Sequence, residues 1–328
     1  MNERPDTISV IMSVYNERED WLRAAIESIL GQTHRELEFI ILLDNPGNTA
    51  LEAVIREYAA RDERIVFLKN DRNRGLVYSL NRGLEAASGI FIARMDADDI
   101  SEPTRLETEL RILREESLDL VAGNLLYIDE EGVLQSDPEH PPYCFGRTPE
   151  ACLRLLRIRN FMPHPTWLVR AEAFRIVGPY HDIPRTEDYE WLCRAASHGL
   201  RMRKIETPML RYRRRRSSIS VSGAYFQRRV TCLIAREYRR ALRRRRELDP
   251  AALERAIARI DPEQDNAPYE EAKAMYADAW SVMRKAPLAG ILGILRAFRL
   301  CPFLLRTVWD DRQMDRVDRK FAPPPSEV

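Results

Sequence analysis

Short apolar runs alternate with amphipathic stretches through the first third of the chain. Short apolar runs bounded by polar residues are typical of buried strands, whereas apolar residues at about every third or fourth position are typical of helices. The predicted strands span Ile8–Val14, Leu37–Leu43, Ile65–Leu68, Ile90–Met95 and Leu118–Gly123. The predicted helices begin after Asn16 and span Leu51–Tyr58, Leu76–Ala87 and Thr104–Leu113. Strands that alternate with helices predict an α/β fold with a doubly wound, mostly parallel sheet.

The pattern changes in the second half of the chain. Gly132–Pro149 is rich in Pro, Gly and polar residues and predicts a long loop. Phe161–Val169 predicts a further strand, and Pro184–His198 predicts a helix with an acidic start. After Ser222, apolar residues fall on one face of long helices and arginines on the rest. We therefore expect an α/β domain over residues 1–222, a helical Arg-rich region over 223–321 and a disordered tail over 322–328.

Acidic residues directly follow the fourth predicted strand, in the run Met95-Asp96-Ala97-Asp98-Asp99. Residues two apart in an extended segment point the same way, so Asp96 and Asp98 present two carboxylates to one side. The carboxyl edge of an open α/β sheet is where ligands bind. Two hard oxygen donors there suit Mg²⁺ or Mn²⁺, which commonly complete their coordination with substrate phosphates. An acidic turn capping the next helix is the alternative, because Ser101 and Pro103 favour a helix start.

Charge is distributed unevenly along the chain. The net charge is only +1, yet Arg201–Arg246 holds 17 Lys and Arg residues against two acids, Glu206 and Glu237. Such a block favours an anionic partner, which is a membrane surface, a phosphorylated substrate or nucleic acid. The hydrophobic content of 45% and charged content of 31% are typical of a folded, water-soluble protein.

The cysteines and the apolar segments indicate a compartment. The five cysteines are scattered and form no C-x-x-C pair, which argues against a disulfide framework or a zinc site and fits a reducing compartment. The polar N-terminus lacks the apolar core of a signal peptide. Nowhere do about 18 uncharged apolar residues follow one another, as a membrane-spanning helix requires. We therefore expect a cytoplasmic protein.

Five motifs occur together and in order. They are Ile11-Met12-Ser13-Val14-Tyr15-Asn16-Glu17, Ser28-Ile29-Leu30-Gly31-Gln32-Thr33, Asn81-Arg82-Gly83-Leu84-Glu85-Ala86-Ala87, Ala93-Arg94-Met95-Asp96-Ala97-Asp98-Asp99 and Thr186-Glu187-Asp188-Tyr189-Glu190-Trp191. Over roughly residues 7–220 the chain resembles the inverting family 2 glycosyltransferases, and most of all the bacterial enzymes of surface-polysaccharide assembly. The resemblance implies the GT-A fold, a nucleotide-diphospho-sugar donor and a divalent metal, Mg²⁺ or Mn²⁺.

The resemblance also implies a role for each acid. Asp98 would ligate the metal, and Asp96 would hold the ribose or the metal's outer shell. Asp99 would take part in the same site or cap the following helix. Asp188 would be the base that takes the proton from the acceptor hydroxyl, with Glu187 supporting it. A structural role at a helix N-terminus, where the helix dipole favours acids, is the alternative for this second pair.

The nucleotide is expected over the first two strand ends. Ser13, Tyr15 and Glu17 match the family's first motif, and Asp44 matches the second of two aspartates that commonly follow the second strand. The chain reads Leu43-Asp44-Asn45-Pro46 where many members read Asp-Asp-Gly-Ser. One acceptor for a ring N–H is therefore lost, which leaves the identity of the nucleotide open.

Further positions are weaker candidates. Arg74 would contact the base or a phosphate, or be a solvated loop residue. His164 and Trp191 would lie on the acceptor side, with a buried structural histidine and a core tryptophan as the alternatives. Near Arg213–Arg216, where several relatives carry a histidine, this chain has only arginines. A guanidinium pairs well with phosphate oxygens, so these arginines are candidates for the diphosphate.

Two absent motifs narrow the function. No Gly-x-Gly-x-x-Gly follows the first predicted strand, which argues against a dinucleotide dehydrogenase. No Gln-x-x-Arg-Trp motif or membrane-spanning bundle is present, and both are features of processive polysaccharide synthases. We therefore expect an enzyme that moves one sugar from a nucleotide-diphosphate donor to a saccharide or a polyprenyl-diphosphate-linked acceptor.

The basic region adds a prediction about membranes. The arginine block and the interrupted apolar stretch Ala286–Val308 suit helices lying in the interface of an anionic membrane. We expect peripheral contact with the inner face of the plasma membrane, with a solvated helical hairpin as the alternative. A nucleic-acid-binding protein and an inactive scaffold of the same fold are the other candidate functions. The block lacks the interleaved aromatics that stack on bases, so we expect no nucleic-acid partner.

Overall fold

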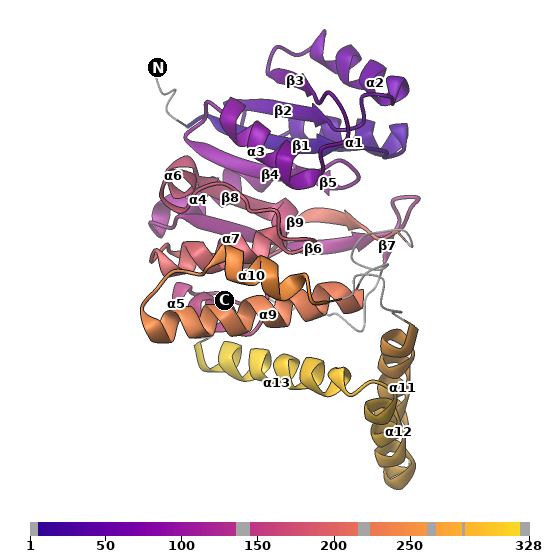
Figure 1. Ribbon diagram of the computed structural model, residues 1–328. Coiled ribbons are helices and arrows are strands. Elements are labelled where there is room, and N and C mark those ends of the chain that lie inside the picture. The colour runs from indigo at the N-terminus through magenta and orange to yellow at the C-terminus, as the bar shows by residue number, and fades with distance from the viewer. Residues whose placement is uncertain (1–5, 136–144, 216–223, 261–266, 284–285, 322–328) are drawn as a thin grey trace, which may run out of the picture.

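The computed structural model describes residues 6–135, 145–215, 224–260, 267–283 and 286–321. Its centre is a nine-stranded sheet with helices on both faces, followed by a helical C-terminal part (Figure 1). The strand order is β3-β2-β1-β4-β8-β6-β9-β5, and β7 pairs with β6. The strands span Ile8–Val14 (β1), Leu37–Leu43 (β2), Ile65–Lys69 (β3), Phe91–Asp96 (β4), Ile100–Ser101 (β5), Leu120–Ile128 (β6), Leu134–Gln135 (β7), Trp167–Arg170 (β8) and Met202–Arg213 (β9).

The helices cover both faces of this sheet and form the C-terminal part. They span Glu19–Leu30 (α1), Thr49–Ala59 (α2), Leu76–Ala86 (α3), Arg105–Glu115 (α4), Pro149–Leu155 (α5), Ala171–Val177 (α6), Glu187–Ser197 (α7), Ala224–Arg244 (α9), Pro250–Ile257 (α10), Ala267–Met283 (α11), Pro287–Leu300 (α12) and Phe303–Phe321 (α13). Strands β3, β2, β1 and β4 are parallel, and β8 then runs antiparallel to β4. The predicted α/β class is confirmed.

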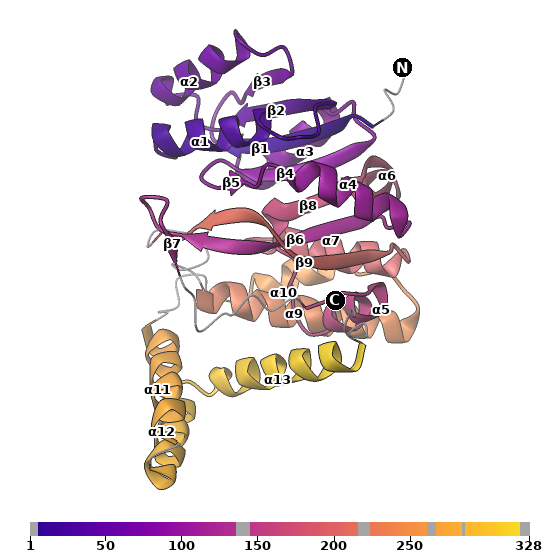
Figure 2. The same cartoon turned by 180° about the vertical axis from the view of Figure 1, so that it is seen from behind.

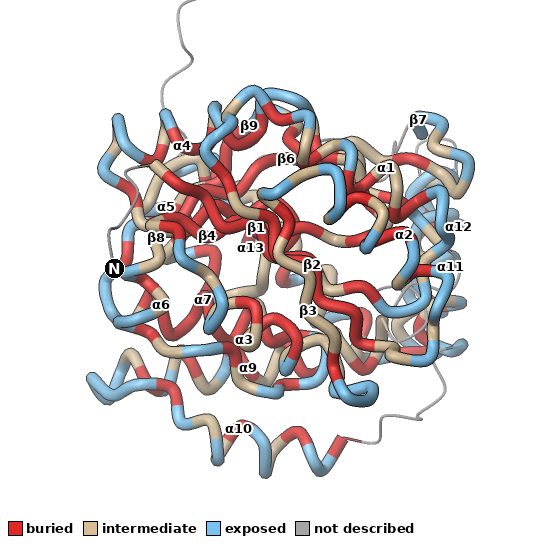
Figure 3. The backbone as a smooth tube through the Cα atoms, turned by 90° about the horizontal axis from the view of Figure 1, so that it is seen from above, coloured by how far each residue is buried: buried red, intermediate tan, exposed pale blue. Residues whose placement is uncertain are grey.

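The strands alternate between two hydrophobic cores. In β1, the side chains of Val10 and Met12 belong to the core beneath α1, α2 and α4, whereas Ile11 faces the core that includes α3 and α7. The same period of two operates in β4, where Ala93 and Met95 face the first core. The intervening polar positions of β4 are therefore directed to the face that carries α7. Figure 3 shows the buried strands at the centre of the molecule.

Residues of two motifs hold helices in place around the sheet. Gln32, fully buried after α1, donates from Nε2 to the carbonyl oxygen of Glu102 (2.8 Å) and accepts from the Leu106 N–H (3.0 Å). It thereby ties α1 to the start of α4. Gly83 brings α3 onto β1, because a Cβ there would lie 2.5 Å from Cγ2 of Ile11. These contacts explain why the motifs extend beyond the residues that carry chemistry.

One strand prediction was wrong, and one strand was missed. Phe161–Val169 is not one strand, since a 3₁₀ turn occupies His164–Thr166 and β8 begins only at Trp167. Two prolines in this stretch lack the N–H that a strand ladder needs. Strand β9 was not predicted, because its apolar residues are hidden within the arginine block. The expected long loop and the expected disordered tail lie partly or wholly outside the described residues.

The apolar face of α9 packs on the sheet domain. Phe226, Val230, Ile234 and Tyr238 join the hydrophobic core that contains α7. Helices α11 and α12 form a hairpin that extends away from the sheet, and α13 returns toward α5 (Figure 2). Among the described residues no single helix has the length and apolarity to cross a membrane; α12 and α13 pass that test only as a pair bent by 116°.

Candidate active site

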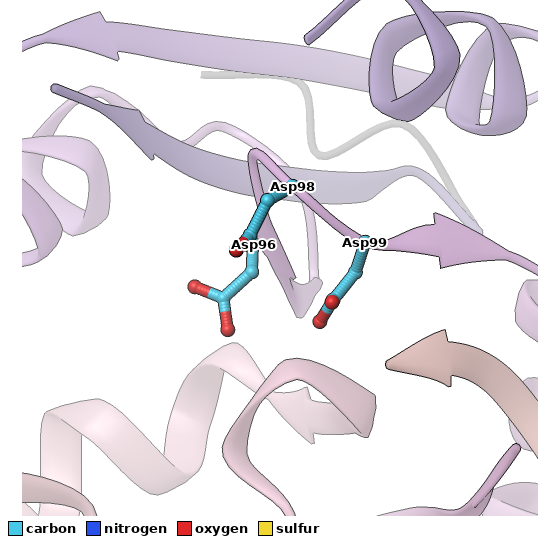
Figure 4. Close-up of side chains that lie close together, drawn as sticks. All are labelled: Asp96, Asp98 and Asp99. Atoms are coloured by element: carbon cyan, nitrogen blue, oxygen red, sulfur yellow. The ribbon is translucent and has the colours of Figure 1, made fainter. Parts of the chain in front are cut away.

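Three carboxylates cluster in the turn after β4. Asp96 ends the strand, Asp98 and Asp99 follow it, and one oxygen from each lies within 4.8 Å of the others (Figure 4). The period of the strand places Asp96 on the α7 face. One oxygen of Asp99 is buried without a hydrogen-bond partner among the described residues. Three hard oxygen donors, one of them unsatisfied, fit a divalent cation such as Mg²⁺ or Mn²⁺.

Arginines from the end of β9 close over this cluster. Nη2 of Arg215 lies 2.7 Å from Oδ2 of Asp98. The backbone N–H of Arg213 donates to Asp99 (2.8 Å), while its guanidinium donates to the carbonyl oxygens of Asp98 (2.8 Å) and Asp129 (2.9 Å). Of the arginines expected at the diphosphate, Arg213 uses its guanidinium to bind backbone carbonyl groups. Arg215 uses its guanidinium to pair with the Asp98 carboxylate. Arg216 lies outside the described residues.

Burial and mutual repulsion raise the pKa values of Asp98 and Asp99. Burial, and next the neighbouring Asp96 carboxylate, raise the pKa of Asp98 to about 6. Burial and the charges of Asp98 and Asp96 raise the pKa of Asp99 well above its ordinary value. Crowded carboxylates of this kind ionise fully only when a cation offsets their charge. The arrangement therefore favours cation binding.

Arg94 links this cluster to the second acid pair. It lies in β4 two residues before Asp96, is 7% exposed, and forms an ion pair with the Asp96 carboxylate. Its charge also lowers the pKa of Glu187 and of Asp188. Its Nε has no hydrogen-bond partner among the described residues. Arg94 thus acts on both acid pairs, which lie some ninety residues apart in the chain.

Glu187 and Asp188 open helix α7. Asp188 is half-buried and accepts hydrogen bonds from Nδ2 of Asn160 (2.7 Å) and from the Tyr189 N–H (2.6 Å). Burial raises the pKa of Asp188 to about 6. Burial and the adjacent Asp188 charge raise the pKa of Glu187 to about 8. Of this pair, Asp188 has the hydrogen bonds that favour its ionised form, and burial beside that charge favours a protonated Glu187.

The two residues expected on the acceptor side are buried. His164 is 7% exposed, its Nε2 lies 3.0 Å from the Tyr180 hydroxyl oxygen, and its Nδ1 lies 3.9 Å from Oε1 of Glu187. Burial, followed by the nearby charge of Arg94, lowers the pKa of His164 well below its ordinary value. His164 is therefore a buried, uncharged histidine that is hydrogen-bonded to Tyr180 and lies near Glu187.

Trp191 belongs to the core. It is fully buried, its indole N–H donates to the carbonyl oxygen of Gly178 (3.0 Å), and its ring packs on Phe174 with centroids 4.6 Å apart. The expectation that Trp191 stacks on an acceptor sugar is corrected, because a ring with no exposed surface cannot receive a ligand. It lies on the inner face of α7, and the acids lie at the start of that helix.

The first-motif residues reach the same cluster from β1. Ser13 is the β1 partner of Asp96 in the parallel ladder. Tyr15, 44% exposed, donates its backbone N–H to Oε2 of Glu17 (2.7 Å). Burial raises the pKa of Glu17, and the Arg215 charge opposes this. The structure thus brings Ser13 and Glu17 beside the acid cluster and leaves the Tyr15 ring open to solvent.

Asp44 organises the loop after β3. It is 3% exposed and accepts hydrogen bonds from Nδ2 of Asn70 (2.7 Å) and from the backbone N–H groups of Arg74 (2.8 Å) and Gly75 (2.8 Å). Gly75 has φ +86°, a conformation that favours glycine. Whether Asp44 also accepts from a nucleobase stays a prediction. The guanidinium of Arg74 is paired with Asp71 at 2.8 Å.

The sequence matches the profile described as Glycosyl transferase family 2 over residues 9–178. The chain is 34% identical over 207 residues to the uncharacterized glycosyltransferase MJ1057 of Methanocaldococcus jannaschii, and the match covers 63% of this chain and 70% of that protein. The chain belongs to glycosyl transferase family 2. The matched residues include the Asp96–Asp99 cluster.

Two further relatives set this glycosyltransferase in context. It is 26% identical to the O-antigen biosynthesis glycosyltransferase WbnJ of Escherichia coli over 225 residues, 68% of this chain and 85% of that protein. Its fold is similar to that of S. aureus TarS, with a TM-score of 0.52 and 16% sequence identity over 70% of this chain. The match spans only 39% of TarS, so this likeness supports the fold alone.

Three residues that the sequence analysis did not single out contact the predicted acids. Arg94 had a signal, since a charged residue within a buried strand, two positions before Asp96, is directed to the same face. Arg215 was one of four adjacent arginines with nothing to separate them. Asn160 had no signal, because its contact with Asp188 depends on how the loop before β8 folds against α7.

Proposed function

We propose that this family 2 enzyme is an inverting, non-processive glycosyltransferase that moves one sugar from a nucleotide-diphosphate donor to a saccharide or polyprenyl-diphosphate-linked acceptor. The observation that carries the proposal is the buried Arg94, which forms an ion pair with Asp96 and whose charge also lowers the pKa of Glu187 and Asp188. One acid group suits the leaving diphosphate and the other suits the acceptor hydroxyl. The WbnJ similarity supports a role in cell-surface polysaccharide synthesis.

The leaving group needs positive charge. A divalent metal held by Asp98, with Asp96 and Asp99 beside it, would supply Lewis-acid stabilisation of the diphosphate. Arg215 adds a guanidinium at the same carboxylate and is suited to phosphate oxygens. Ser13, Tyr15 and Glu17 are proposed to contact the nucleotide, because they approach from the neighbouring strand end.

The acceptor needs a base. We assign this role to Asp188, because it is half-buried, held by two hydrogen bonds and ionised at neutral pH. The acceptor oxygen would attack the anomeric carbon as its proton passes to Asp188. The bond from that carbon to the diphosphate oxygen would break, and its electron pair would leave with the nucleotide. Attack opposite to the leaving group inverts the anomeric centre.

The experiment that tests the proposal starts from the donor. UDP-, GDP-, dTDP- and CMP-sugars are screened for thermal stabilisation with and without Mn²⁺, because a ligand that binds only the folded state raises its melting temperature. The stabilising sugar is then tested for nucleotide release, and the product's anomeric configuration is read by NMR. We expect stabilisation by one nucleotide class, dependent on Mn²⁺ and absent in Asp98→Ala. Retention of configuration in the product would contradict the proposal.

Two other functions are separated by the same assays. A nucleic-acid-binding protein would give a salt-dependent gel shift with ordinary oligonucleotides, and an inactive scaffold would bind donor without slow hydrolysis. We propose peripheral membrane contact on the cytoplasmic side, because a lipid-linked acceptor would be reached there.

A further inference from the structure

The C-terminal helices leave large apolar side chains in solvent. On α12, Leu288 is 80% exposed, Leu292 56% and Leu295 58%. Their spacings of four and three residues place them on one stripe of the helix. On α13, Leu305 and Trp309 are 55% and 58% exposed and lie one turn apart. Rows of large exposed apolar side chains on two neighbouring helices are typical of an interaction site.

The exposed stripe lies away from the contacts that hold these helices. Helix α12 packs on α11 through Gly290, where a Cβ would lie 2.9 Å from the Ala279 carbonyl oxygen, and through the buried Ala297. Helix α13 packs on α5 through the fully buried Met314. The exposed leucines and Trp309 thus take no part in the packing that holds α12 and α13 against the other described residues.

A basic groove adjoins this apolar surface. A cavity of about 550 Å³ lies between α5, α9 and α13, and Trp309 is part of its lining. Among the described residues, its other lining side chains include six cations, Arg154, Arg157, Arg239, Arg306, Arg316 and Lys320, and one acid, Asp310.

Within the described lining, the one acid Asp310 lies among the four arginines Arg157, Arg239, Arg306 and Arg316. Asp310 is already shared, with Arg306 at 3.1 Å and Arg228 at 3.1 Å. Burial lowers the pKa of Arg239, and the nearby Arg306 charge lowers it further. The groove therefore suits an anion with several oxygens, of which a phosphate group is the common biological example.

We propose that α12, α13 and this basic groove dock the enzyme on an anionic phospholipid bilayer, with the exposed leucines and Trp309 in the interface and a lipid phosphate in the groove. The proposal rests on the membrane contact proposed above and names the surface that makes it. A bilayer is favoured over a soluble phosphate compound because the groove and the apolar surface share Trp309. The proposed membrane contact excludes the apolar face of α9, because that face is already buried against the sheet domain.

Vesicle flotation of the full chain, without donor or metal, tests the proposal. The parent protein should float with vesicles of phosphatidylglycerol and phosphatidylcholine and not with pure phosphatidylcholine. Arg157→Ala/Arg316→Ala should weaken binding about 30-fold, because each cation near an anionic surface contributes about a factor of five. Leu288→Ser/Leu292→Ser/Leu295→Ser should weaken binding about tenfold or more, through lost apolar burial.

Matched controls come from other faces of the molecule. Arg61→Ala/Arg111→Ala removes the same charge from exposed surface ion pairs, and Ile176→Ser removes one apolar side chain of 50% exposure from α6. Both controls should float like the parent protein. Asp98→Ala should also float normally, which separates this proposal from the one about sugar transfer.

Two results would overturn the proposal. One is the absence of flotation with anionic vesicles at moderate salt. The other is loss of flotation in the arginine variant alone, with pyrophosphate raising the melting temperature of the parent protein but not of that variant. The groove would then be a site for a soluble phosphate compound.

Discussion

Arg215 forms an ion pair with Asp98, the acid proposed to hold the metal, with its Nη2 2.7 Å from Oδ2 of that carboxylate. The pair is largely shielded, since the side chains are 26% and 13% exposed. A divalent cation binding to Asp98 must compete with this guanidinium for the same oxygen. The ion pair thus offsets part of the cluster's negative charge and disfavours a second cation at the same oxygen.

Arg215→Ala is expected to tighten Mn²⁺ binding in the absence of donor roughly fivefold, the equivalent of about 1 kcal/mol from one lost ion pair. Titration calorimetry with Mn²⁺ measures it. Arg214→Ala is the matched control, because it removes the same charge from a guanidinium that lies 3.9 Å from the Tyr127 ring centroid. Equal tightening in both variants would show a general charge effect and contradict the competition.

Asp188→Asn is expected to abolish transfer while donor binding stays within about twofold, because the amide cannot accept the proton. In the parent enzyme kcat/KM should fall as the pH drops through about 6, since Asp188 then gains a proton and stops acting as a base. A pH–rate profile, with donor affinity measured separately, checks both. Transfer by Asp188→Asn at the parental rate would refute the assignment.

Asn160→Ala is expected to move the acidic limb of that profile to higher pH. The Asn160 hydrogen bond lowers the pKa of Asp188, so its loss favours the protonated acid. A residue that served only the fold would lower the rate equally at every pH. An unshifted limb with a lower plateau would therefore contradict this positioning role.

Arg105→Ala is expected to destabilise the protein by about 3–5 kcal/mol, because it leaves Glu109 buried and unpaired. Arg105 and Glu109 are both fully buried, and Nη2 of Arg105 also donates to the carbonyl oxygen of Arg94 (2.9 Å). Urea unfolding measures the loss.

The control for this prediction lies on the same helix. Arg111 and Glu115 have the same spacing in α4 but are 59% and 58% exposed. Arg111→Ala should cost no more than about 1 kcal/mol. Equal losses in Arg105→Ala and Arg111→Ala would show that burial of the first pair has no energetic role.

Prediction from the sequence succeeded where the signal was local. The parallel strands β1 to β4 are short apolar runs, and the helices between them have apolar residues at helical spacing. The succession of these elements along the chain could therefore be predicted. It failed at β9 and at Phe161–Val169. In the first, charge concealed an alternating strand; in the second, prolines interrupted an apolar run.

In the site, too, the positions fixed by local sequence were predicted and those fixed by tertiary packing were not. The placement of Asp96 and Asp98 depends on a strand end, which the pattern reveals. The burial of Trp191 and His164 depends on which face of α7 and which side of the 3₁₀ turn meet the core, and one chain's pattern leaves that open. The family motifs predicted both residues on the acceptor side of the site. In the structure both side chains are buried.

The sequence by itself determined the order of strands and helices and the acids at their ends, because periodicity and turn chemistry act over a few neighbouring residues. Only the tertiary structure decided the pairing of Asn160 with Asp188 and of Arg215 with Asp98. These contacts join segments between about 28 and 117 residues apart, whose meeting depends on sheet register and helix packing rather than on local preference.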